Sequence, residues 1–133
     1  MTDKIAFDIV SPERLLLSDE ADMVTVPGAD GEFGVLAGHM PLISTLRPGV
    51  IDIKGGVISG DSRFFVLGGF AEVNAVKITI LAEEATPIAS IDAAALEQRI
   101  RNTEEDLGLA KTEPDRTRVA EQLDHLRQLR AAL

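Results

Sequence analysis

The sequence of 133 residues contains no cysteine, tryptophan or tyrosine, and only two histidines. Without cysteine, the protein can have no disulfide framework, no thiol nucleophile, no iron–sulfur cluster and no cysteine-based zinc site. Bases are also scarce, because 13 Lys and Arg residues face 22 Asp and Glu residues and leave a net charge of −9. Nucleic-acid phosphates and anionic membrane surfaces repel such a protein. We therefore expect no nucleic-acid partner, and partners that are basic or are bound through apolar contacts.

Long apolar runs are missing as well. No run approaches the ~20 residues that a membrane-spanning helix needs, so we expect no direct membrane insertion. The start of the sequence lacks the basic and apolar stretches of a signal peptide, and we expect no export. The length suits one main core with a small appendage.

Residues 1–88 hold most of the glycines and β-branched residues, in short apolar runs separated by turn residues. Residues 5–10 have an apolar residue at every second position, which is typical of a strand with one wetter face. Several strands within 88 residues predict two packed sheets or a flattened barrel, because one open sheet would leave an apolar face exposed. The further strands are expected at residues 14–17, 22–26, 33–36, 43–46, 50–53, 56–59, 63–67, 71–74 and 77–81.

After residue 90 the composition shifts to Ala, Leu, Glu, Arg and Gln, and apolar residues recur every three or four positions. This period predicts two helices, one capped by Asp92 and one starting near Thr112 with Pro114 in its first turn. Neither helix can bury its stripe alone, so the two should pack antiparallel. The stripes consist of Leu96, Ile100, Thr103, Leu107 and Ala110, and of Val119, Leu123, Leu126 and Leu129.

The predicted fold is therefore mainly β plus α. It has an N-terminal two-sheet β-sandwich of about ten strands at residues 1–88 and a C-terminal antiparallel two-helix hairpin at residues 89–133. The sandwich sequence has a net charge of −7 and the hairpin sequence a net charge of −2. The hairpin seam is thin and buries little area, so the hairpin is either a movable arm or a fixed appendage.

The sequence shows no catalytic, metal or cofactor motif. Glycines at positions 28, 31 and 34 have neither dinucleotide-binding nor phosphate-loop spacing, and Asp30 and Glu32 would repel a phosphate. There is no Gly-x-Ser-x-Gly motif and no cysteine nucleophile, so neither His39 nor His125 belongs to a recognisable hydrolase motif. We expect His39, in its Gly-His-Met-Pro turn, to bond to nearby backbone or to contact a partner. Residues 33–50 and 64–70 hold more large apolar side chains than a core requires, which indicates a protein interface.

Residues 26–53 read V-P-G-A-D-G-E-F-G-V-L-A-G-H-M-P-L-I-S-T-L-R-P-G-V-I-D-I, and the Gly-Gly-Phe-Ala-Glu-Val run follows at residues 68–73. Both segments, together with the opening at residues 7–13, closely resemble the epsilon subunit of bacterial F-type ATP synthases. The resemblance spans the whole chain and implies the same sandwich-plus-hairpin fold. It implies a noncatalytic subunit of the central stalk, peripheral on the cytoplasmic side of the bacterial inner membrane, which links the gamma subunit to the polar loops of the c-ring for rotary coupling.

By position, the resemblance implies that Glu32 faces the c-ring and that His39 lies near the gamma subunit. The segments around these two residues form the expected contact set with the c-ring or gamma. That set is Gly31, Glu32, Phe33, Gly34, His39, Met40, Pro41 and Leu42.

In some members of this family the hairpin binds ATP, or it extends to the alpha and beta subunits and blocks ATP hydrolysis. The ATP motif starts here with Ile91 and Asp92, but its arginine position holds Ala95, so phosphate binding would fall to Arg99. An ATP-binding sensor module is the alternative function, and a small hydrolase is a remote third. For inhibition, the bases available to contact the catalytic head are Arg116, Arg118, Arg127 and Arg130. Acids balance these bases within residues 113–133, so we expect weak or absent inhibition.

Overall fold

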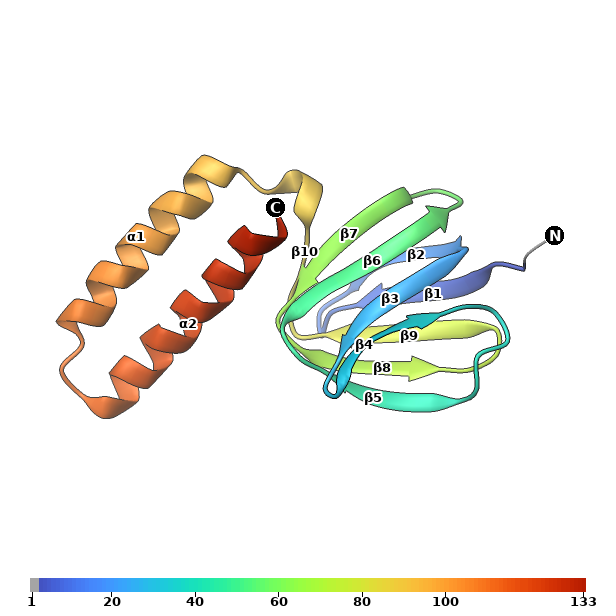
Figure 1. The fold of residues 1–133 in the computed structure, drawn as a ribbon, viewed down its shortest axis with the longest axis horizontal. Helices are drawn as coiled ribbons and strands as arrows, with labels where there is room; N and C mark the ends of the chain where they lie inside the picture. The colour runs from blue at the N-terminus through green and yellow to red at the C-terminus, as the bar shows by residue number, and fades with distance from the viewer. Residues whose placement is uncertain (1–2) are drawn as a thin grey trace. The chain divides into compact units, whose positions relative to one another are not determined.

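A computed structural model describes residues 3–133 and divides the chain into two compact units (Figure 1). The first unit ends at Ala89 and is built of strands, and the second, Ser90–Leu133, is built of helices. Within the described residues, no helix is both long and apolar enough to span a bilayer. The predicted fold class, a β-sandwich followed by two helices, is confirmed.

The strands of the first unit are short and follow one another closely, because Gly, Pro or short polar segments end the apolar runs. They are β1 (Ile5–Val10), β2 (Leu15–Ala21), β3 (Met23–Gly28), β4 (Gly31–Val35), β5 (Leu42–Leu46), β6 (Gly49–Gly56), β7 (Gly60–Val66), β8 (Gly69–Val73), β9 (Lys77–Ala82) and β10 (Ala85–Pro87), followed by a 3-10 turn, η1 (Ile88–Ser90).

The strands pair in the order β10-β7-β6-β3-β5-β8-β9-β1-β2, and β4 pairs with β3. Strand β3 joins the two layers, since Met23 to Thr25 pair with β6 while Gly28 pairs with Leu46 of β5. All neighbours are antiparallel except β1 and β9, which run parallel. One half of the sandwich is thus β5, β8, β9, β1 and β2, and the other half contains β3, β6, β7 and β10.

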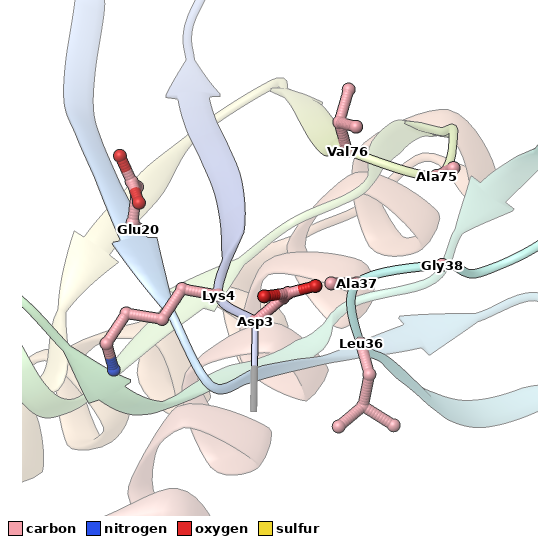
Figure 2. Close-up of a pocket in the computed structure, with 8 residues that line it drawn as sticks. All are labelled: Asp3, Lys4, Glu20, Leu36, Ala37, Gly38, Ala75 and Val76. Atoms are coloured by element: carbon pink, nitrogen blue, oxygen red, sulfur yellow. The ribbon is translucent and has the colours of Figure 1, made fainter. Parts of the chain in front are cut away.

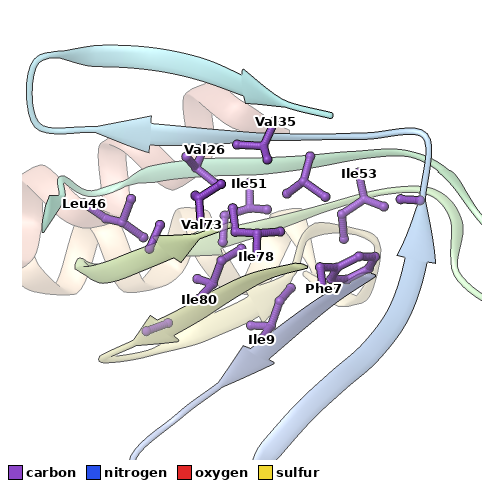
Figure 3. Close-up of a cluster of buried hydrophobic side chains, with 14 of the residues drawn as sticks. Phe7, Ile9, Val26, Val35, Leu46, Ile51, Ile53, Val73, Ile78 and Ile80 are labelled. Atoms are coloured by element: carbon purple, nitrogen blue, oxygen red, sulfur yellow. The ribbon is translucent and has the colours of Figure 1, made fainter. Parts of the chain in front are cut away.

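The core lies between these two halves and consists of aliphatic side chains with one phenylalanine (Figure 3). Ile5, Phe7 and Ile9 of β1 are fully buried, which confirms the alternation predicted for the first strand. The other strands completely bury Val24, Val26, Val35, Ile51, Ile53, Val66, Ile78 and Ile80.

The strand predicted at residues 56–59 is wrong. Strand β6 ends at Gly56, residues 57–59 form a turn, and β7 starts at Gly60. The carboxylate of Asp19 accepts hydrogen bonds from the Ile58 and Ser59 amides at 3.0 and 2.9 Å. A side chain from β2 therefore satisfies donors that a strand partner would otherwise satisfy, and the β-branched Val57 and Ile58 misled the pattern.

The second unit contains α1 (Ala93–Leu109) and α2 (Glu113–Ala132). Both predicted caps are confirmed: the Asp92 carboxylate accepts from the Ala94 amide at 2.9 Å, and Thr112 Oγ1 accepts from the Asp115 amide at 3.3 Å. Buried side chains from both helices form one small cluster, as the antiparallel packing of the stripes predicts. The cluster consists of Leu96, Ile100, Leu123 and Leu126, with Ile91, Leu107 and Leu129 at its margin.

Candidate protein interfaces

The first predicted contact segment, residues 31–34, begins β4 just after a tight turn. Glu32 lies opposite Pro27 in the β3–β4 pairing, and its side chain is exposed. The next residue, Phe33, is partly buried and packs against the core. Gly34 is exposed, but a side chain there would start 3.1 Å from Met23 Sδ. Of these residues, Glu32 therefore presents a charged group to solvent beside the turn at Ala29 and Asp30.

The second predicted segment, residues 39–42, covers the end of the loop between β4 and β5 and the first residue of β5, Leu42. His39 Nδ1 is 2.7 Å from the Met40 carbonyl oxygen and must carry the proton to donate to it. Nε2 of the neutral ring is then left as an acceptor. Met40 is 79% exposed, while Leu42 is 40% exposed and Pro41 is also exposed.

These two segments meet at one point, where the Phe33 and His39 rings lie 6.4 Å apart between centroids. Otherwise they diverge. The turn before Glu32 lies beside Leu46 at the end of β5, because Gly28 pairs with both Gly31 and Leu46. Leu42 pairs with Val73 at the opposite end of the same strand. The predicted contact set therefore occupies two ends of the sandwich rather than one cluster.

A second surface was only partly foreseen from the sequence. Leu15, Val10, Leu81 and Phe70 form one continuous cross-strand line over β2, β1, β9 and β8, and we call it the apolar row. Core residues adjoin Val10, Leu81 and Phe70 along their strands, namely Ile9, Ile80, Ala82 and Ala71, and Leu16 beside Leu15 packs against the core. The four side chains therefore share the outer face. Leu15, Leu81 and Phe70 are 55%, 47% and 52% exposed.

With strands about 4.8 Å apart, the apolar row is about 14 Å long. The next line on this face is polar and includes Glu72, Thr79 and Asp8. Lys77 Nζ is 2.8 Å from Asp8, and Ser18 donates to the same carboxyl. These hydrogen bonds, that from Lys77 first, lower the pKa of Asp8 below its ordinary value. An apolar line beside fixed charges suits a protein interface.

Phe70 belongs to the apolar run at residues 64–70 that indicated an interface, and within this run Phe65 is buried and Phe64 is partly buried. The apolar row as a whole could not be read from the sequence, because it requires the register of four strands. The sequence did contain one signal of this surface: a large apolar residue at an outward-facing strand position, such as Leu81 between Ile80 and Ala82.

The residues named for ATP binding lie at the start of α1. Ile91 borders the hairpin core, and the Asp92 carboxylate caps the helix through the Ala94 and Ala95 amides. An anion at this helix terminus would have to displace that carboxylate and would meet its charge. Arg99 is exposed two turns further along. This arrangement offers a phosphate a single distant guanidinium.

The four bases named for contact with the catalytic head lie on α2 and have partners within the hairpin. Arg127 and Arg130 face α1, at 3.6 Å from Glu104 and 3.5 Å from Glu97. Arg118 lies 3.9 Å from Asp115 one turn away. Arg116 donates to the Ala110 carbonyl oxygen at 3.4 Å. Because the ion-paired arginines are about half exposed, each ion pair is weak.

Among residues 3–133, no group of three His, Asp or Glu side chains is arranged to hold a metal ion. The His39 ring donates a hydrogen bond within its own loop, to the Met40 carbonyl oxygen. Among residues 3–133, no hydroxyl or carboxyl forms a hydrogen bond with this ring.

Comparisons with known proteins agree with one another. The sequence model of the β-sandwich domain of the ATP synthase delta/epsilon chain matches residues 4–88. The ATP synthase epsilon chain of Parvibaculum lavamentivorans is 47% identical over 130 residues, which make up 98% of each chain. That of Paramagnetospirillum magneticum is 53% identical over 117 residues, or 87% of this chain and 86% of the relative.

Solved structures show the same fold. A chain from the Euglena gracilis mitochondrial ATP synthase, solved as an OSCP/F1/c-ring assembly, matches with a TM-score of 0.81 and 25% identity. The match covers 97% of this chain and 81% of that one. A chain from the central stalk and c-ring of the Tetrahymena thermophila mitochondrial enzyme matches with a TM-score of 0.66 at 13% identity, which supports the fold alone.

Proposed function

This chain belongs to the epsilon chains of ATP synthase, and from that premise we propose that it works in the central stalk, linking the gamma subunit to the c-ring. The observation that supports this proposal best is the 47% identity to an epsilon chain over 98% of both lengths. The chain is a noncatalytic subunit of the complex. Its contribution is mechanical, because it must hold its neighbours tightly enough to transmit torque.

The gamma subunit binds to the apolar row. Three of its side chains are about half exposed, and burying them against a partner would supply a large part of the binding free energy. Phe70 is the aromatic anchor of the kind that dominates protein interfaces. The polar line through Glu72 and Asp8 forms the rim. His39 would contact gamma separately, from the β4–β5 loop at the other end of β5, through its Nε2 acceptor.

The polar loops of the c-ring bind to the turn that precedes β4. Glu32 is exposed there beside Asp30, and two carboxylates at a turn attract basic loop residues. Attachment through gamma and the c-ring makes the chain a peripheral protein on the cytoplasmic side of the inner membrane. No segment of the chain itself needs to enter the bilayer for this attachment.

Copurification of gamma with tagged variants of this chain tests the proposal. Replacing Phe70 and Leu81 with serine removes apolar contact at the centre of the row and should weaken gamma binding by about tenfold or more. Leu109→Ser changes an equally large side chain that is 75% exposed on α1, and this control should retain gamma. Full retention of gamma by the Phe70 and Leu81 variant would contradict the assignment of this face.

A charge reversal tests the c-ring contact separately. Glu32→Lys should reduce recovery of the c-ring with the tagged chain while gamma is retained. Glu105→Lys, which makes the same change on exposed α1, serves as its control. Unchanged recovery of the c-ring with Glu32→Lys would remove this part of the proposal.

We expect the hairpin to inhibit ATP hydrolysis weakly or not at all. Contact with the alpha and beta subunits would require basic side chains, and Arg127 and Arg130 already lie against Glu104 and Glu97. An extended hairpin would have to break these ion pairs before it could offer the bases to an acidic partner.

A further inference from the structure

A hollow of about 660 Å³ opens at the end of the sandwich that carries the β4–β5 loop, away from the apolar row and from Glu32. The segment before β1, the end of β2, the β4–β5 loop and the β8–β9 turn meet there (Figure 2). Its walls are fixed by backbone hydrogen bonds, from the Gly38 amide to the Ala75 carbonyl at 2.7 Å and from the Ala6 amide to the Val76 carbonyl at 3.1 Å. We call it the end hollow, and its main lining residues are Asp3, Glu20, Leu36, Ala37, Ala75 and Val76.

The rim of the end hollow is apolar. Leu36 and Val76 are 48% and 71% exposed, and Figure 2 shows them extending on opposite sides of Asp3 and Ala37. The β6–β7 turn adds Val57 and Ile58, which are 65% and 79% exposed. This turn adjoins the hollow, because the Val57 amide donates to the Glu20 carbonyl oxygen at 2.8 Å.

The apolar turn is held rigidly in this exposed position. The Asp19 carboxylate accepts from the Ile58 amide at 3.0 Å, and from the Ser59 amide and hydroxyl at 2.9 and 2.8 Å. Turns are usually built from polar residues, Gly or Pro, and an isolated turn gains nothing from two exposed β-branched residues. Buried hydrogen bonds that fix such a turn in solvent keep its apolar surface available to a partner.

The electrostatics of the end hollow favour a cation. Lys4 lines it, but its ammonium is already bonded to Asp22 at 2.8 Å and to the Gly55 carbonyl oxygen at 3.0 Å. Within residues 3–133, no base lies within ion-pair distance of the Asp3 or Glu20 carboxylate. Two free carboxylates between apolar rims match the ammonium or guanidinium of a side chain with an aliphatic stem.

The net charge of this chain opposes the docking of its own segments in the hollow. A second copy carries a charge of −9 and would be repelled by the acidic hollow at long range. We propose that the end hollow docks a basic, apolar segment of a different polypeptide, with a Lys or Arg side chain between Asp3 and Glu20 and aliphatic side chains on Leu36, Val76 and the Val57-Ile58 turn. This proposal does not depend on the apolar row, and it concerns a site next to His39, which directly follows Gly38 of the hollow.

A synthetic helical peptide of alternating Leu and Lys pairs serves as the probe for isotope-labelled full-length chain. In amide NMR spectra we expect saturable shifts at Gly38, Ala75 and Val76. A matched peptide with Glu in place of Lys should produce none. Shifts confined to Phe70 and Leu81 would overturn the proposal, and so would the absence of saturable shifts at the end hollow.

Two variants test the recognition itself. Glu20→Lys and Val76→Ser change exposed side chains and should each weaken peptide binding by about tenfold. Glu105→Lys and Leu109→Ser make matched changes on exposed α1 and should alter binding less than about twofold. Equal weakening by Glu20→Lys and Glu105→Lys would show that net charge alone attracts the peptide, and the proposal would fall. The spectra of the variants also report directly whether each one is folded.

Discussion

Asp19 is the buried charged side chain among the described residues, and it joins β2 to the β6–β7 turn. Burial raises the pKa of its carboxyl. Hydrogen bonds from the Ser59 amide and hydroxyl and from the Glu20 and Ile58 amides outweigh burial, and the pKa falls below the ordinary value of 3.8. A carboxylate with this many donors stabilises the fold in its charged form.

Asp19→Asn keeps the shape of the side chain but removes its charge, and it should lower the free energy of unfolding by about 1–3 kcal/mol near neutral pH. Because the folded pKa is the lower one, the contribution of Asp19 is complete above the unfolded pKa and is lost as pH falls through the folded pKa. We therefore expect the difference in the free energy of unfolding between the parent and Asp19→Asn, measured with urea, to be constant from neutral pH to about pH 5. This difference should shrink toward about pH 3.

Asp106→Asn on exposed α1 provides the control for that measurement and should leave stability within about 0.5 kcal/mol of the parent at each pH. A difference between Asp19→Asn and the parent that stays constant into strong acid would contradict the role of the charge.

Position 69 must be a glycine, for two reasons that the backbone shows. Its φ angle is +131°, and a Cβ atom at this position would fall on the Leu81 carbonyl oxygen of the neighbouring strand. Backbone cannot move aside as a flexible side chain can. Gly108 of α1, in contrast, has open space around its Cα.

Gly69→Ala should therefore destabilise the sandwich by about 3 kcal/mol or more, through strain and clash. Gly108→Ala should stabilise the hairpin by about 0.5–1 kcal/mol, because alanine loses less entropy in a helix. Thermal unfolding of both variants checks the two signs. Equal stability of Gly69→Ala and the parent would mean that β8 and β9 can separate at no cost.

At the scale of the element, the hairpin is held by a small apolar cluster and two ion pairs. Leu123 is 3% exposed within the cluster, whereas the paired side chains of Arg127 and Glu104 are both 49% exposed. Burial of a leucine should exceed the contribution of half-exposed ion pairs, because water screens the charges.

Leu123→Ala should lower hairpin stability by about 2–3 kcal/mol, and Arg127→Gln combined with Arg130→Gln by less than about 1 kcal/mol. Amide hydrogen exchange in α1 and α2 measures both effects in the full chain. If the arginine variant lost more protection from hydrogen exchange than the leucine variant, the ion pairs would stabilise the hairpin more than the burial of Leu123 does, contrary to this prediction.

At the scale of the whole molecule, the core residues of the sandwich all belong to strands of the first unit. A chain lacking residues 90–133 should therefore still fold and bind gamma. In the assembled complex its loss should change ATP hydrolysis by less than about threefold, which is less than about 0.7 kcal/mol of coupling. Steady-state ATPase rates of purified complexes measure this, and a rise well above threefold would establish the hairpin as an inhibitor.

The sequence by itself determined the features that depend on neighbouring residues. The alternation of Ile5, Phe7 and Ile9 defined a strand with one buried face, and Asp92 and Thr112 marked the starts of the two helices. These signals are local, since the pleat of a strand and the open amides of a first turn act within a few residues.

The tertiary structure decided how distant segments meet. Leu15, Leu81 and Phe70 become one surface through the register of their strands, and the Val57-Ile58 turn exists because Asp19, about forty residues away, binds its amides. Likewise, the arginines of α2 were bases without partners in the sequence and found Glu97 and Glu104 on α1. Register and long-range pairing depend on the total energy of the packed chain, and no short window of sequence contains that energy.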